Sequence, residues 1–108
     1  MNPTHDSRRT RIEEMLKAQP HDVFLRYALA LELDKAGEHD AALTLFKELM
    51  ASPDNYVPAY FMAGQMLTRL GRAIEAGEIL RAGIEQANKQ GDQHAANEMS
   101  GFLTMIEE

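Results

Sequence analysis

The sequence predicts an all-α protein of about six helices, arranged as antiparallel helical hairpins. Apolar residues recur with a helical period throughout its 108 residues, and no segment shows the strict alternation of a half-buried strand. A second observation is the regular punctuation of these apolar segments by Pro20, Gly37, Pro53, Gly71 and Gly91. The third is a repeat, in which residues 33–46, LDKAGEHDAALTLF, resemble residues 67–80, LTRLGRAIEAGEIL.

The first three helices follow from this punctuation. We expect the first over about residues 7–18, with Ile12, Met15 and Leu16 on one face. The second starts near Asp22, a good N-cap, and ends at Gly37. The third occupies about residues 38–51.

The remaining helices are placed in the same way. The fourth begins near residue 54 or 55, because Pro58 is tolerated only in a first turn, and it ends before Gly71. The fifth is expected over about residues 72–90 and the last over residues 92–107. The last has a single apolar stripe, formed by Ala95, Met99, Phe102, Leu103 and Ile106. One stripe predicts that this helix packs on one side only.

Composition and charge limit the classes of function. The formal net charge is −6, so the summed field repels nucleic acid. With no cysteine, the chain has no disulfide, thiolate zinc site or thiol nucleophile. No apolar run is long enough to span a membrane and no signal sequence opens the chain, so we expect a cytoplasmic protein without a membrane or nucleic-acid partner.

The second and third helices align with the fourth and fifth at a constant offset of 34 residues without a gap. The alignment places Ala30 on Gly64, Leu33 on Leu67, Gly37 on Gly71 and Ala42 on Ala76. The small residues at 30, 64, 42 and 76 allow each pair of helices to cross closely. Two helices per 34 residues, with small residues at the crossing, resemble the tetratricopeptide repeat. The resemblance implies a short right-handed solenoid, similar to small stand-alone bacterial proteins of this family.

One domain over residues 1–108 is expected. Because two repeats alone rarely bury a continuous core, the flanking helices should complete it. We therefore divide the chain into a degenerate half repeat (7–19), two repeats (22–55 and 56–91) and a C-terminal capping helix (92–108).

The second and fourth helices are apolar on two sides, and this second stripe is the candidate site. In the family that the chain resembles, it lines a concave groove that receives a peptide. The groove positions carried over are Phe24, Tyr27, Leu31, Lys35, Phe61, Met62, Gln65 and Arg69. The clamp that grips chaperone carboxylate tails in one subgroup is missing, since its lysine, asparagine and arginine positions are Tyr27, Leu31 and Met62. The alternative is that a terminal helix covers the stripe.

The sequence thus predicts a non-enzymatic module that binds a peptide or helical segment of another protein. No cofactor, catalytic residue or metal site is expected, because the four histidines lie on separate segments without metal-ligand spacing. Gly77 and Gly83, inside the fifth helix, are attributed to close packing. The alternative function is a self-assembling scaffold, in which Met99, Phe102, Met105 and Ile106, or Met15 and Leu16 at the other end, contact a second copy.

Overall fold

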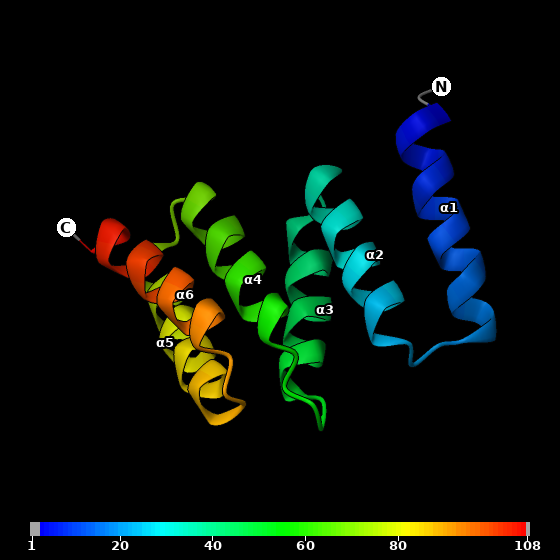
Figure 1. Ribbon diagram of the computed structural model, residues 1–108. Helices are drawn as coiled ribbons and strands as arrows, with labels where there is room; N and C mark the ends of the chain where they lie inside the picture. Colours follow the sequence, from blue (N-terminus) through cyan, green and yellow to red (C-terminus); the bar gives the residue numbers. More distant parts are fainter. Residues whose placement is uncertain (1–2, 108) are drawn as a thin grey trace. The chain divides into compact units, whose positions relative to one another are not determined.

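The computed structural model describes residues 3–107, with side chains from Arg8 onward, and within that range it contains six α-helices and no strand (Figure 1). The helices are α1 (Pro3–Ala18), α2 (Val23–Lys35), α3 (His39–Ala51), α4 (Val57–Arg69), α5 (Ala73–Lys89) and α6 (Gln93–Ile106). The all-α prediction is confirmed. The largest difference is the start of α1, which begins at Pro3 rather than near residue 7, because a proline fits the first turn of a helix. Residues 1, 2 and 108 of the expected domain lie outside the described range.

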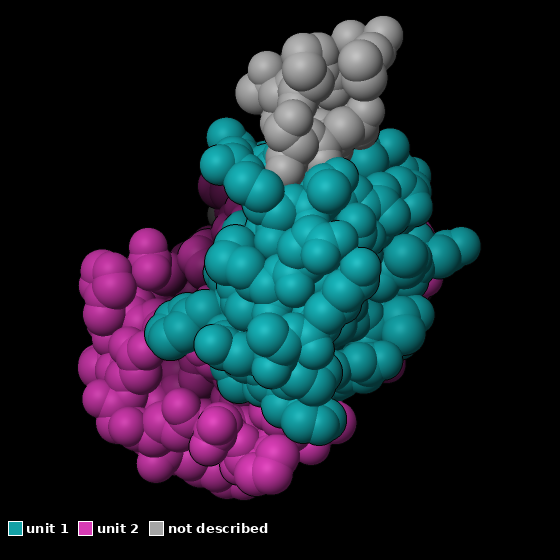
Figure 2. All heavy atoms as spheres, turned by 90° about the vertical axis from the view of Figure 1, so that its right-hand side faces the viewer, with its two compact units in different colours: residues 1–49 teal, residues 50–108 magenta. Residues whose placement is uncertain are grey.

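The chain forms two compact units, residues 1–49 and residues 50–108, coloured separately in Figure 2. The first contains α1, α2 and most of α3, and the second contains α4, α5 and α6. Each unit is described on its own.

Three glycines close the helical hairpins. Gly37, Gly71 and Gly91 have φ values of 81°, 78° and 74°, a left-handed conformation that costs other residues free energy. In each turn the N–H after the glycine donates to the carbonyl five residues earlier, at an N–O distance of 2.8 or 2.9 Å. This is the Schellman arrangement, which satisfies carbonyls at the end of a helix. The predicted turns at Gly37, Gly71 and Gly91 are therefore confirmed.

In the first unit, the described part of α1 contacts α2 and the turn that follows it through a buried side chain and ion pairs. Ile12 is buried, Arg8 lies 3.7 Å from Glu32, and Arg9 pairs with Glu38. Hydrogen bonding to Glu38 holds the pKa of the Arg9 guanidinium above its usual value. The charged side chains thus add to a small apolar contact.

A ring contact and polar contacts join α2 to α3. The rings of Tyr27 and Phe46 have centroids 6.3 Å apart, and Phe46 is fully buried. Arg26 lies 2.6 Å from Glu48, and Asp34 Oδ1 lies at hydrogen-bond distance, 3.1 Å, from His39 Nδ1. Tyr27 therefore contributes to the packing of its own hairpin.

The core of the second unit is formed by α4, α5 and α6 around two glycines. A methyl group at Gly83 would lie 2.5 Å from Tyr60 Cβ and 2.7 Å from Met99 Sδ. At Gly64 it would lie 2.6 Å from Leu80 Cδ2. Close packing is therefore confirmed as the reason for Gly83 and for the small residue at 64. The surroundings of Gly77 are less tight, since an added methyl group would lie 3.3 Å from Arg81 Nη1, 3.6 Å from Glu107 Oε2 and 3.8 Å from Leu103 Cδ1.

Tyr60 gives the second unit a pH dependence. Its hydroxyl donates to the Met50 carbonyl at 3.4 Å, and burial raises the pKa of the Tyr60 phenol, as burial also does for Tyr56. The unfolded chain loses this proton near pH 10, before the folded chain does. The stabilisation is therefore complete below about pH 10 and is lost as the pH rises through the folded pKa.

We expect the free energy of unfolding to fall above about pH 10, and Tyr60→Phe to reduce this fall. Urea denaturation of both proteins at about pH 8 and about pH 11 measures the difference. An identical loss in the two proteins would contradict the assignment to Tyr60.

Candidate functional site

The α2 surface begins with one strongly exposed aromatic side chain. Asp22 caps the helix, its carboxylate accepting a hydrogen bond from the Leu25 N–H at 2.9 Å, and this fixes the first turn that carries Phe24. Phe24 is 73% exposed, whereas Ala30 and Leu33 on the same helix are buried. The predicted division of α2 into a buried side and a second apolar side is visible at Phe24.

The other predicted residues of α2 are less accessible. Tyr27 and Leu31 are half-buried, and part of the Tyr27 ring contacts Phe46. Lys35 is exposed and lies 3.5 Å from Glu32. Phe24 is thus the most exposed of the predicted apolar residues of α2.

The predicted residues of α4 are partly covered by the C-terminal helix. The rings of Phe61 and Phe102 meet edge to face, with centroids 5.8 Å apart and planes at 71°. Met62 and Gln65 are half-buried, and Arg69, at the end of the helix, is exposed. The sequence left open whether a terminal helix covers the second stripe. At Phe61, α6 does so.

The residues assigned to self-association lie mostly inside the second unit. Met99 is fully buried between α4, α5 and α6, so it cannot contact a second copy while the unit is folded. Phe102 and Ile106 are half-buried and pack against the same core, and Met105 is 64% exposed. At the other end, Met15 is 49% exposed and Leu16 is half-buried.

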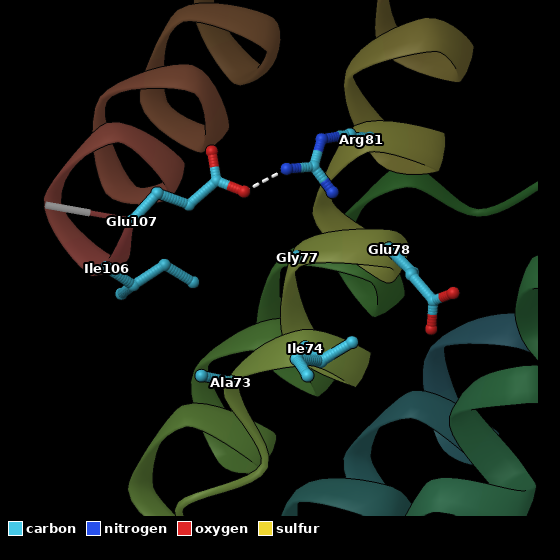
Figure 3. Close-up of a pocket in the computed structure, with 7 residues that line it drawn as sticks. All are labelled: Ala73, Ile74, Gly77, Glu78, Arg81, Ile106 and Glu107. Carbon is cyan, nitrogen blue, oxygen red and sulfur yellow. Dashed lines mark hydrogen bonds and ion pairs between the residues drawn. The ribbon is translucent and has the colours of Figure 1, made fainter.

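An open hollow that sequence reasoning missed lies between the N-terminal half of α5 and the C-terminal end of α6 (Figure 3). Its volume is about 710 Å³, and it is lined by Ala73, Ile74, Gly77, Glu78, Arg81, Ile106 and Glu107. Ile74 is 85% exposed. The repeat could have indicated this hollow, because Ile74 of the second repeat aligns with Asp40 of the first. An aliphatic residue thus stands at a position that is polar in the other repeat.

Among the described residues, no three histidine, aspartate or glutamate side chains are grouped so that they could hold a metal ion. No helix in residues 3–107 is long and apolar enough to cross a membrane.

The chain is similar to several proteins whose structures have been solved. No protein-family model matches the chain, and no curated protein matches it. The solution structure of a tetratricopeptide repeat domain protein from Salinibacter ruber is 36% identical, with a TM-score of 0.76 over 82% of this chain and 89% of that one. A crystal structure of such a protein from the same organism is also 36% identical, with a TM-score of 0.71 over 81% of this chain and 97% of that one.

A third structure is more distant in sequence. It is the solution structure of a protein from Bordetella parapertussis, 25% identical, with a TM-score of 0.78 over 92% of this chain and 86% of that one. All three match most of their own length, so the similarity extends over most of each chain.

Proposed function

Because the chain belongs to the tetratricopeptide repeat family, a fold that generally serves protein interaction, we propose that it is a non-enzymatic module binding a peptide or helical segment of another protein. The second stripes of α2 and α4 are the proposed contact surfaces. The observation that carries the proposal is Phe24, an aromatic side chain that is 73% exposed in the first turn of α2.

An exposed phenylalanine supplies a large apolar contact at a small cost in conformational entropy, since only two torsions are fixed on binding. Met62 is half-buried on α4, and methionine adapts to ligands of different shape. Lys35 and Arg69, both exposed, can meet acidic residues that flank the bound segment. These properties suit an apolar or amphipathic segment with acidic flanks.

The structure also decides which substitutions test this proposal. Phe61 packs on Phe102 and Tyr27 packs on Phe46, so replacing either ring removes a contact inside the protein. A loss of binding in those variants could come from a loss of folding. Phe24 is the most exposed of these three rings, and we therefore choose it for the test.

We expect Phe24→Ser to abolish capture of the partner while the circular dichroism spectrum and melting temperature stay close to those of the native protein. The native protein, immobilised, is used to capture binding proteins from extract of its own host, and mass spectrometry identifies them. The matched control is Met105→Ser, which removes another exposed apolar side chain, from α6. If the proposal is right, Met105→Ser captures the same partner as the native protein, and Phe24→Ser does not. Equal capture by all three proteins would exclude the α2 surface.

A further inference from the structure

The hollow of the second unit has an exposed apolar side chain, Ile74, beside an acidic one, Glu78. Ile74 and Glu78 are four residues apart on α5, so they lie on the same face of the helix. Ile74 is 85% exposed, and within residues 8–107 no cation lies at ion-pair distance from Glu78. The other charged residues of the hollow, Arg81 and Glu107, already pair with each other, as the dashed line in Figure 3 shows.

Gly77 also lines the hollow and is buried. A methyl group at Gly77 would lie 3.3 Å from Arg81 Nη1, 3.6 Å from Glu107 Oε2 and 3.8 Å from Leu103 Cδ1. The paired side chains of Arg81 and Glu107 therefore lie close to Gly77. Ile74 and Glu78 are exposed residues of α5 in the hollow that are not part of this ion pair.

The exposed face of α1 has the complementary pattern. Arg11 and Met15 are also four residues apart, so they share one face of α1, while Ile12 is the buried residue of the helix. Met15 is 49% exposed. Arg11 is exposed, and among the described side chains it has no ion-pair partner. An apolar and a basic residue on α1 thus have the same spacing as an apolar and an acidic residue on α5.

We propose that the hollow binds α1 of a second copy of this chain. If α1 lies antiparallel to α5, Met15 faces Ile74 and Arg11 faces Glu78, since four residues span about 6 Å along both helices. The contact joins two different surfaces, so it is heterologous and can continue from copy to copy as a chain or close as a ring. It uses residues other than those of the proposed function and does not depend on them.

The test is the mass in solution. Sedimentation equilibrium of the full chain is measured from about 10 µM to about 1 mM, because a small contact is expected to be weak. Low salt is used so that the charge pair is not screened. We expect the weight-average mass to rise with concentration above the 12.1 kDa of one chain. A constant monomer mass over this range would overturn the proposal.

Two charge reversals test the pairing itself. Arg11→Glu and Glu78→Lys each replace an attraction with a repulsion, and we expect each to raise the dissociation constant about tenfold. The double variant should restore association, because the pair is then present with its signs exchanged. The control is Glu85→Lys, which makes the same charge change elsewhere on α5, at a position outside the hollow. The pairing would be contradicted by an unchanged dissociation constant in both single variants. It would also be contradicted by a double variant that associates as weakly as the single variants.

Mixing the two single variants tests the pairing without the double variant. The Arg11→Glu protein keeps an intact hollow, and the Glu78→Lys protein keeps an intact α1. Together they should associate, because the native pair forms at one contact and the pair with its signs exchanged forms at the next, whereas each alone stays near the monomer mass. Ile74→Ser is the second disruptive variant, and its hollow should not bind α1 of another copy. A mixture that stays near the monomer mass would contradict the pairing of Arg11 with Glu78.

Discussion

Gly83→Ala should destabilise the protein by about 1–3 kcal/mol, the usual range for overpacking a close-packed core. The added methyl group would lie 2.5 Å from Tyr60 Cβ, which cannot move without its backbone, and 2.7 Å from Met99 Sδ. Helices α4 and α6 would therefore have to move away from α5. Urea denaturation followed by circular dichroism measures the change in the free energy of unfolding.

Gly101→Ala is the matched control, since the same change is made on α6 where nothing lies within 4 Å of the new methyl group. There the higher helix propensity of alanine acts alone and should stabilise the protein by about 0.5–1 kcal/mol. The two variants thus have opposite expected signs. A Gly83→Ala protein as stable as Gly101→Ala would show that α4, α5 and α6 do not meet at Gly83.

Met99→Ala should cost about 2–5 kcal/mol, because Met99 is fully buried and its removal leaves a cavity between the helices. Met105→Ala, six residues later on the same helix, removes a side chain that is 64% exposed. It should change the free energy of unfolding by less than about 0.5 kcal/mol. Thermal and urea denaturation of the two variants measure the difference.

This pair of methionines also separates two roles of α6. If Met99 contacted a second copy instead of the core, Met99→Ala would lower the mass in solution and leave the stability of the monomer unchanged. Because Met99 is buried in the core, we expect Met99→Ala to lower the free energy of unfolding of the monomer. The sequence placed Met99 on the apolar stripe of the last helix, and that stripe is what packs on α4 and α5.

The helices were predictable because their ends are set locally. Gly37, Gly71 and Gly91 are the residues that adopt a positive φ at low cost, so their positions alone mark the ends of three helices. The repeat then indicated the pairing, because the small residues at 30, 64, 42 and 76 were expected where two helices cross, and all four are buried. Glycine and alanine at a fixed interval carry this information in the sequence itself.

The surface was less predictable, because exposure depends on which neighbour lies over a residue. Phe61 and Phe24 both belong to the predicted second stripe, yet Phe102 packs on the first and Phe24 is 73% exposed. In the same way, Gly77 and Gly83 look alike in the sequence, and only their different surroundings show that one is required by packing. No periodicity separates these cases, since the covering residue comes from another helix.

The glycine turns also bear on how quickly the protein folds. Each closes a hairpin between helices that are neighbours in the chain, at α2–α3, α4–α5 and α5–α6. Chains dominated by such local contacts have a low relative contact order and fold within microseconds to milliseconds. In repeat proteins, folding can begin in one hairpin and spread to the next. We expect nucleation in α4–α5–α6, where the buried residues are most numerous, with α1 joining last because Ile12 is its one buried side chain among those described.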